Sequence, residues 1–351
     1  MGIIVKLMSF WVMKNGAETR RPPHRPCTHF SRVLLCTALS VVATNAVGQT
    51  YPARPVVLVS PYAAGGPVDQ LARVIARNMS SRLNQPFLVE NRVGAGASIG
   101  ANYVAKAEPN GYTLLIGTPA SQMITPAMIL TPYNGVRDFA FIGMIDTAAN
   151  VLVVNPKVPA KNLKELIALA KASPDLLSYG TAGVGTSPFM DGEGFKHDAG
   201  ISMSHIPYKG AAPALNDLIA GVIQVGLSNV SAVLPFIKSG QLRALAYAAK
   251  SRASTLPDVP TFVEEGLPDV LSSSWRVLAA PAGTPPAVLD VLSKTLVAIQ
   301  ADPAFQKQLS AQGSDLFVMG PADTKAYMAV EAKRTLQLLG SLKLLAGGAN
   351  E

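Results

Sequence analysis

The chain has 351 residues, of which 49% are hydrophobic and 15% are charged, so it is long enough for two ordinary domains and too apolar for a disordered protein. Its formal net charge of +8 would suit nucleic acid or an acidic membrane, but six basic residues and one acid lie before Gln49. The remaining 24 basic and 21 acidic residues form no basic stripe, which excludes a nucleic-acid partner.

The first 48 residues have the layout of a secretory signal peptide with a long basic leader. A basic stretch ends at Arg32 and is followed by the apolar run 33–43, which is shorter than the ~20 residues that span a bilayer. Ala46-x-Gly48 fits a small-x-small cleavage site, and Thr44-x-Ala46 is an alternative. We therefore expect export to the periplasm. A membrane anchor is the alternative, and translation from Met13 is an alternative to the full leader.

Cysteine and histidine usage limits the chemistry of the mature protein. Cys27 and Cys36 both lie in the leader, which excludes disulfides, a thiol nucleophile and cysteine-bound zinc from the rest. His197 and His205 are eight positions apart and do not match the spacing of a zinc-binding helix. We therefore expect no metal and no cofactor.

After Gln49 short apolar runs alternate with helical patterns. The runs predict strands over 56–61, 87–91 and 112–117, and apolar residues at helical spacing predict helices over 68–83 and 98–107. This β-α-β-α-β order indicates an α/β fold with parallel strands and helices on both faces of the sheet. Ligands bind such sheets at the carboxyl ends of the strands.

A second unit of the same kind begins near residue 151. It alternates strands (151–154, 177–180, 205–208, 222–228 and 242–249) with helices (163–172, 189–199, 212–220 and 230–240). An irregular connection over 256–274 leads to a strand over 275–281 and to helices over 286–301, 303–312 and 322–345. We expect one lobe from 49–150 with 275–351 and a second lobe from 151–274, with crossings near Asn150 and Trp275.

The loop after the first predicted strand has the composition of an anion site. Tyr62, Ala63, Ala64, Gly65 and Gly66 separate that strand from its helix. The free N–H groups and the dipole of a helix start favour an anion, and glycine lets a ligand approach the backbone closely. On local pattern alone, a plain turn without a ligand remains the alternative. The helix then opens with Asp69, which either caps its first turn or orients a water.

Two further loops have the same character. One contains Thr181, Ala182, Gly183, Thr186 and Ser187, between a strand and a helix of the second unit. The other contains Thr118 and Ser121 and follows the strand at 112–117. Loops from separate lobes that face each other would grip an anion from two sides. The loops at 61–69 and 180–187 contain no arginine, which favours a small organic carboxylate, aliphatic or aromatic, over a phosphate.

An enzyme is the rival class, for example a serine-type hydrolase that uses Ser187. A triad of Ser187 with a histidine, or a pair of Asp191 and Glu193, needs an arrangement that the sequence does not encode. Neither a nucleophile elbow nor a P-loop occurs, and the glycines at 94, 96 and 100 have the wrong spacing for a dinucleotide site. We therefore expect a binding protein and not an enzyme.

Several motifs in order resemble one family. They are Tyr51-Pro52-x-Arg54-Pro55, the 61–69 loop, Val89-Glu90-Asn91-Arg92-x-Gly94-Ala95-Gly96, Pro109-Asn110-Gly111-Tyr112-Thr113-Leu114, Tyr179-Gly180-Thr181-Ala182-Gly183-x-Gly185-Thr186, Pro207-Tyr208-Lys209-Gly210, Leu256-Pro257-Asp258-Val259-Pro260-Thr261 and Ala280-Pro281-Ala282-Gly283-Thr284-Pro285. From about residue 51 to its C-terminus the chain resembles the Bug proteins, the substrate-binding proteins of tripartite tricarboxylate transporters.

The resemblance implies a two-lobed type II periplasmic binding protein fold with a hinged cleft. It also implies a large and a small integral-membrane subunit as partners, and we expect a monomer. It places the ligand on the 62–66 loop with Asp69, on the 181–187 loop, on Lys209 and on Asn229. Pro67 replaces a frequent glycine of the family, and Ser228 replaces a common aspartate, which bears on the choice of ligand. A periplasmic sensor that feeds a signalling kinase is the alternative that the sequence does not separate.

Overall fold

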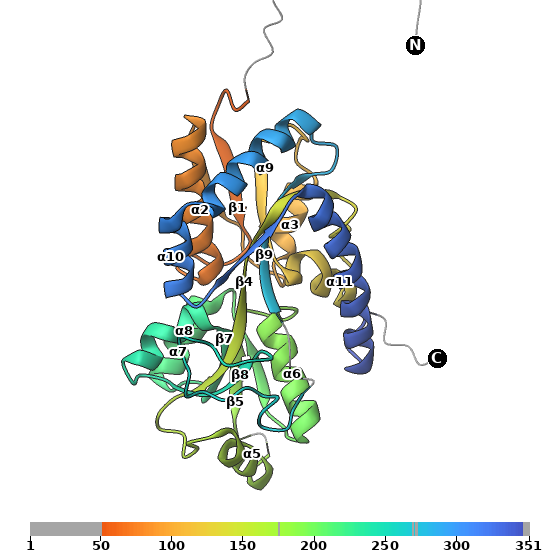
Figure 1. Ribbon diagram of the computed structural model, residues 1–351. Helices are drawn as coiled ribbons and strands as arrows, with labels where there is room; N and C mark the ends of the chain where they lie inside the picture. Colours follow the sequence, from red (N-terminus) through yellow and green to blue (C-terminus); the bar gives the residue numbers. More distant parts are fainter. Residues whose placement is uncertain (1–50, 175, 269, 271–272, 347–351) are drawn as a thin grey trace, which may run out of the picture. The chain divides into compact units, whose positions relative to one another are not determined.

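The computed structural model describes residues 51–346 except 175, 269, 271 and 272 (Figure 1). All of these residues belong to one compact unit that begins at Thr50. The expected signal peptide, its basic leader and both cysteines lie outside the described residues. Within the described part, no helix combines the length and the apolar character that crossing a membrane requires.

The first sheet has the strand order β2-β1-β3-β9-β4-β10. Its strands are β1 (Val56–Ser60), β2 (Phe87–Asn91), β3 (Thr113–Gly117), β9 (Ser273–Pro281), the first part of β4 (Phe139–Val154) and β10 (Asp315–Met319). β1 pairs in parallel with β2 and with β3, which confirms the arrangement expected from the β-α-β-α-β order. β9 is antiparallel to both β3 and β4.

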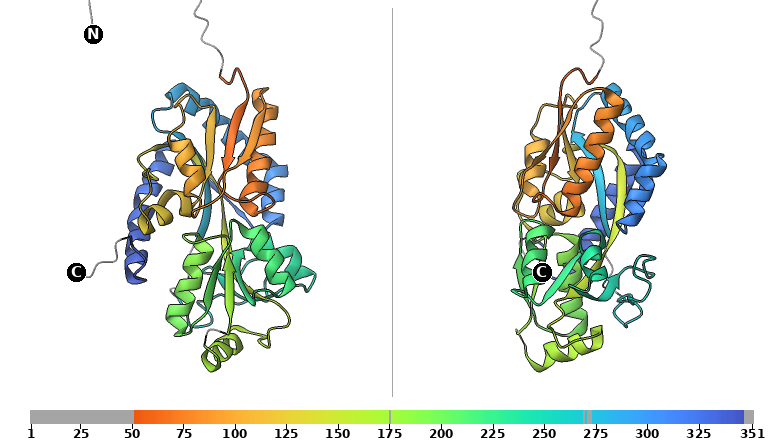
Figure 2. Two further views of the ribbon diagram at one scale, coloured as in Figure 1. Left: turned by 180° about the vertical axis from the view of Figure 1, so that it is seen from behind. Right: turned by 90° about the vertical axis from the view of Figure 1, so that its left-hand side faces the viewer.

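Helices cover both faces of this sheet, as the two views of Figure 2 show. Neighbouring residues of β1 illustrate the reason, because strand side chains alternate between faces. Leu58 belongs to a core shared with α2 (Pro67–Leu83), α9 (Pro286–Gln300) and α10 (Pro303–Ala311). Val59 belongs to a core shared with α3 (Ser98–Ala105) and α11 (Pro321–Ser341). α2 turns Leu71, Ile75 and Met79 into the first core at helical spacing.

The second sheet has the strand order β8-β4-β7-β5-β6. It contains β5 (Ser178–Thr181), β6 (Ser204–Pro207), β7 (Val225–Asn229) and β8 (Arg243–Ala248), with α5 (Leu163–Ala172), α6 (Ser187–Ala199), α7 (Ala211–Ala220) and α8 (Val230–Lys238) around it. Its cores gather around Tyr179 and Phe195 on one face and around Leu218 and Tyr247 on the other. Because these cores are separate from those of the first sheet, the two sheets form two lobes.

One long strand, β4, belongs to both sheets. Its residues 139–149 pair with β9, and its residues 150–154 pair with β7 and β8. At the change of partner, the Asn150 side chain donates to Asp191 at 2.6 Å and accepts from Asn229 at 2.7 Å. α11 also contacts both lobes, because Leu339 near its end packs with Phe189 of α6. Figure 1 shows β4 running from the first sheet into the second, with β9 beside its first part.

Three segments were not expected from the sequence. The first part of β4 contains Asp146 within an apolar run, and the structure places Arg276 of β9 opposite it as a buried ion partner. β10 is a short, half-exposed edge strand that pairs with β4 through a register shift. Residues Ala120–Ile124 and Thr125–Met128 form a π-helical turn and a short α-helix after β3, where only a polar loop was expected.

Candidate functional site

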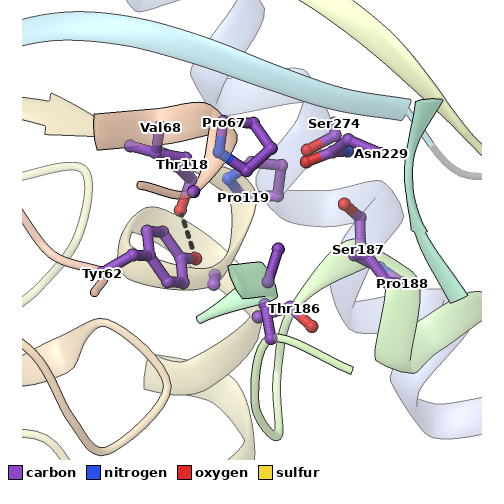
Figure 3. Close-up of a pocket in the computed structure, with 14 residues that line it drawn as sticks. Tyr62, Pro67, Val68, Thr118, Pro119, Thr186, Ser187, Pro188, Asn229 and Ser274 are labelled. Carbon is purple, nitrogen blue, oxygen red and sulfur yellow. Dashed lines mark hydrogen bonds between the residues drawn. The ribbon is translucent and has the colours of Figure 1, made fainter. Parts of the chain in front are cut away.

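Four helices begin at one cavity between the two sheets. The chain runs from β1 into α2, from β5 into α6, from β6 into α7 and from β7 into α8, so each helix starts at the carboxyl end of a strand. The residues that line the cavity (Figure 3) are Tyr62, Gly66, Pro67, Val68, Thr118, Pro119, Ala120, Ala182, Thr186, Ser187, Pro188, Ala211, Asn229 and Ser274. This cavity, which we call the ligand cavity because it is the candidate binding site, therefore takes groups from both lobes.

The ligand cavity is small and carries no charged side chain among its lining residues. Its volume of about 30 Å³ has room for about two water molecules. In Figure 3, Tyr62 and Thr118 lie on one side of it, and Ser187, Asn229 and Ser274 lie on the other. The polar groups of the wall are thus hydroxyls, an amide and the backbone of helix starts.

Asp69 fixes the loop between β1 and α2. It is buried, and its carboxylate accepts hydrogen bonds from Gly65 N at 2.9 Å, from Arg73 Nε at 3.0 Å and from Asn91 Nδ2 at 2.8 Å. Burial would raise the pKa of Asp69, but the bonds from Arg73, Gly65 and Asn91 outweigh it and hold the pKa below its ordinary value. Asp69 therefore holds the loop in place and does not line the ligand cavity.

Tyr62 connects this loop to the loop that contains Thr118 and Ser121. Its hydroxyl lies 3.1 Å from Thr118 Oγ1, and its carbonyl accepts from Asn91 Nδ2 at 2.9 Å. Burial raises the pKa of Tyr62 to about 12, so the phenol keeps its proton and remains a donor. Ser121 is turned away from the cavity, because its Oγ accepts from Thr118 N at 2.9 Å and donates to Thr118 O.

Neutral hydrogen bonds hold the loop between β5 and α6. Thr186 is the N-cap of α6: its Oγ1 accepts from Phe189 N at 3.3 Å and donates to Gly183 O at 2.7 Å. Thr181 Oγ1 accepts from Gly183 N at 3.2 Å and lies 2.8 Å from His205 Nε2. Burial lowers the pKa of His205 to about 4, which keeps the ring neutral.

The two lobes touch directly beside the cavity. Ala63 N donates to Lys209 O at 3.1 Å, so Lys209 contributes its carbonyl while its side chain is exposed. A Cβ at Gly210 would lie 3.1 Å from Ala63, and a Cβ at Gly185 would lie 2.5 Å from Thr125 Oγ1. Gly185 has a φ of +80°, a conformation that favours glycine. Glycines therefore permit the close approach of the lobes.

The structure brings together about half of the residues expected to bind ligand. Tyr62, Gly66, Thr118, Ala182, Thr186, Ser187 and Asn229 line the ligand cavity. The remaining expected residues lie outside its lining: Ala63, Ala64, Gly65, Asp69, Ser121, Thr181, Gly183 and Lys209. The other lining residues had not been expected to bind ligand: Pro67, Val68, Pro119, Ala120, Pro188, Ala211 and Ser274. Val68 and Ala211 stand at helix starts, a signal that would have pointed to them.

Neither histidine of the described chain is bonded as a hydrolase would need. His205 bonds to Thr181 and stacks between Tyr179 and Phe189, with ring centroids 4.7 and 4.9 Å away. His197 is exposed and pairs with the adjacent Asp198. Among the described residues, no cluster of three histidine, cysteine or acidic side chains could hold a metal ion.

Residues 71–344 match the model of the tripartite tricarboxylate transporter family receptor. The chain belongs to this family. Its resemblance to the Bug proteins is thereby confirmed, and so is its role as the solute-binding receptor of a transport system.

Solved structures of the receptor family agree with this fold. The periplasmic binding protein BugD is 33% identical with a TM-score of 0.81, over 84% of this chain and 100% of that one. A Rhodopseudomonas palustris protein solved with adipate is 32% identical with a TM-score of 0.81, over 84% and 99%. MatC from the same organism, with bound malate, is 27% identical with a TM-score of 0.79, over 82% and 100%. These similarities confirm the two-lobed periplasmic binding fold.

Proposed function

We propose that this receptor captures a small organic carboxylate in the ligand cavity and delivers it unchanged to integral-membrane transporter subunits. It acts in the periplasm as a monomer, and it is not an enzyme. The observation that carries the proposal is the convergence of four helix starts on a cavity whose lining residues include no charged side chain.

Helix starts attract anions through their free N–H groups and through the positive end of the helix dipole, which is worth about half a charge. α2, α6, α7 and α8 direct four such ends at the ligand cavity. No arginine or lysine lines the cavity, and phosphate more often recruits such a side chain. The adipate and malate of the related structures support a carboxylate as the ligand class.

The residues expected to bind ligand divide into those that line the cavity and those that hold its loops in shape. We assign ligand contact to Tyr62, Gly66, Thr118, Ala182, Thr186, Ser187 and Asn229. Tyr62 and Ser187 line the cavity from opposite lobes. Among the remaining expected residues, Asp69, Ser121 and Thr181 hold their loops in shape through hydrogen bonds, as Asp69 does for Gly65.

Closure of the lobes is part of the proposal. Residues 49–150 with 275–351 form the first moving body, and residues 151–274 form the second, with hinges near Asn150 and Trp275. A cavity of about 30 Å³ is too small for an organic carboxylate, so the lobes must part to admit one. Ligand then draws the lobes together. Small-angle scattering should show a smaller radius of gyration with ligand; tight binding at an unchanged radius would contradict a hinge.

Substitutions at Gly66 test the site. A Cβ there would lie 3.5 Å from Ala63 O and 3.9 Å from Ala211 N, which is ordinary contact. Gly66→Ala should therefore bind nearly as the parent does, whereas Gly66→Trp should fill the cavity and abolish binding. We expect micromolar affinity or better for carboxylates, about −8 kcal/mol, by calorimetry after a thermal-shift screen. Stabilisation by sugars or phosphates alone, or binding indifferent to Gly66→Trp, would refute the site.

Export and the lack of catalysis have their own tests. The N-terminus of protein recovered from the periplasm should lie between Val47 and Gln49, and an intact leader there would contradict cleavage. Ligand incubated with the purified protein should be recovered unchanged, whereas turnover at catalytic stoichiometry would identify an enzyme.

A further inference from the structure

A second, larger cavity adjoins the ligand cavity; we call it the rear cavity. Its volume is about 380 Å³, within the size range of small-molecule sites. Residues of both lobes line it, including Met190 of α6, Trp275 of β9 and Leu338 of α11. Neither the family match nor the related structures assign a role to this space.

Pro119 and Ser187 line both cavities and so lie where the two adjoin. Pro119 follows β3 of the first lobe, and Ser187 begins α6 of the second. Adjacent residues of β9 face different cavities, because Ser274 lines the ligand cavity and Trp275 lines the rear cavity. The rear cavity therefore extends the space between the lobes, because residues of both lobes line it as well.

The wall of the rear cavity is mainly apolar, with Met123, Ile124, Met190, Trp275 and Leu338. Its charged residues are balanced in sign: two cations, Lys250 and Arg334, and two acids, Asp315 and Glu331. Glu331 lies 3.7 Å from Arg334, so this pair largely neutralises itself. A second carboxylate that entered this cavity would therefore meet no net attraction, whereas an apolar group would be removed from water.

We propose that the ligand is a carboxylate with a single charge, whose bulky apolar tail passes between Pro119 and Ser187 and lies in the rear cavity. The inference rests on the proposed function, because the carboxylate end must sit at the helix starts of the ligand cavity. It narrows the substrate class to carboxylates with an aliphatic or aromatic tail, and it makes the rear cavity the part of the protein that selects among them.

Calorimetry on the mature protein with propanoate, hexanoate, 3-phenylpropanoate and adipate tests the class. Each methylene buried in the rear cavity should raise the affinity about fourfold. Hexanoate and 3-phenylpropanoate should therefore bind at least tenfold tighter than propanoate, and hexanoate should bind tighter than adipate. Equal affinities, or adipate tighter than hexanoate, would overturn the inference and leave the proposed function intact. A failure of all four to bind would count against the proposed function itself.

Substitutions that fill the rear cavity test whether the apolar tail of the ligand lies there. Thr335 of α11 and Ala249 after β8 both line it and are half-buried. Thr335→Phe and, independently, Ala249→Leu should lower the affinity for 3-phenylpropanoate at least tenfold and leave that for propanoate unchanged. Ala329→Leu, on an exposed position of α11 outside the lining, is the matched control. If both folded variants keep the parent's affinity for 3-phenylpropanoate, the tail does not lie in the rear cavity.

Discussion

The two loops that face each other across the ligand cavity are held by different chemistry. In the first loop, the buried carboxylate of Asp69 collects donors from Gly65, Arg73 and Asn91. In the second loop, Thr181 and Thr186 exchange neutral hydrogen bonds with backbone atoms, and Thr181 also contacts His205. The first loop depends on a charge and the second on hydroxyls beside a titratable ring.

This difference predicts unequal sensitivity. Loss of a buried carboxylate leaves several donors without an acceptor, which costs more than the loss of one neutral bond. The first loop should therefore behave as a fixed wall of the site, while the second responds to smaller changes and to pH. The three predictions below run from the largest expected effect to the smallest.

Replacement of Asp69 by Asn should have the largest effect. The amide keeps the size of the side chain but replaces one oxygen by an N–H₂ group, which faces either the Oδ2 donors, Gly65 N and Arg73 Nε, or the Oδ1 donors, Arg73 Nη2 and Asn91 Nδ2. We expect the free energy of unfolding to fall by about 3 kcal/mol and ligand affinity to fall with it, as measured by urea denaturation and calorimetry. Asp290→Asn is the control, because Asp290 pairs with Lys294 on the surface and should cost under about 0.5 kcal/mol. Equal costs would show that charge does not hold the first loop.

Removal of the Thr186 hydroxyl should have an intermediate effect. Thr186→Ala loses the N-cap bond to Phe189 N and the bond to Gly183 O at the start of α6. We expect a loss of about 1 kcal/mol in unfolding free energy and weaker ligand binding. Thr186→Ser keeps the hydroxyl and should restore both quantities. Weak binding by the serine variant would mean that the methyl group, and not the cap, supports the site.

A mild fall in pH should act on the second loop first. The folded protein holds the pKa of His205 at about 4, below the ~6.5 of an unfolded histidine. Between these pH values His205 binds a proton in the unfolded chain but not in the folded protein. Stability therefore falls as the pH drops from about 6.5 to about 4. The pKa of Asp69 is lowered as well, but for a carboxylate this shift favours the charged form, so the first loop keeps its stability until the pH falls below the ~3.9 of an unfolded aspartate.

Thermal unfolding measured from pH 7 to pH 5 gives the slope of stability against pH. His205→Gln keeps a polar partner for Thr181 and removes the titration, so its stability should vary less with pH than that of the parent. His197→Gln alters an exposed side chain and is the control. A His205→Gln variant with the full slope of the parent would assign the pH dependence to another group.

Much of the fold could be predicted because short strands around the site are each followed by a helix. β1 with α2 shows this pattern most clearly, because the strand is almost entirely apolar and α2 buries Leu71, Ile75 and Met79 along one face. β4 could not be predicted in full, because Asp146 interrupts its apolar run and is compensated only by Arg276, 130 positions away in the chain. β10 has neither burial nor strict alternation to distinguish it from a loop.

The site was predicted at the level of loops and less well at the level of atoms. Asp69 was expected near the ligand, yet its spacing of four from Arg73 fits a helical ion pair, which the structure shows. Lys209 was expected to contact the ligand; it lies outside the cavity lining, and its carbonyl accepts from Ala63 N across the lobes. Ser274 could not be predicted, because it reaches the ligand cavity only through the pairing of β9 with β4.

The hydrogen bond from Ala63 N to Lys209 O joins the lobes through main-chain atoms alone. Every residue except proline supplies an N–H at position 63, and every residue supplies a carbonyl at position 209. Selection for a new nutrient can therefore alter the side chains that line either cavity while this contact persists. The contact between the lobes and the choice of ligand can therefore change independently in evolution. One scaffold can in this way give rise to receptors for many ligands.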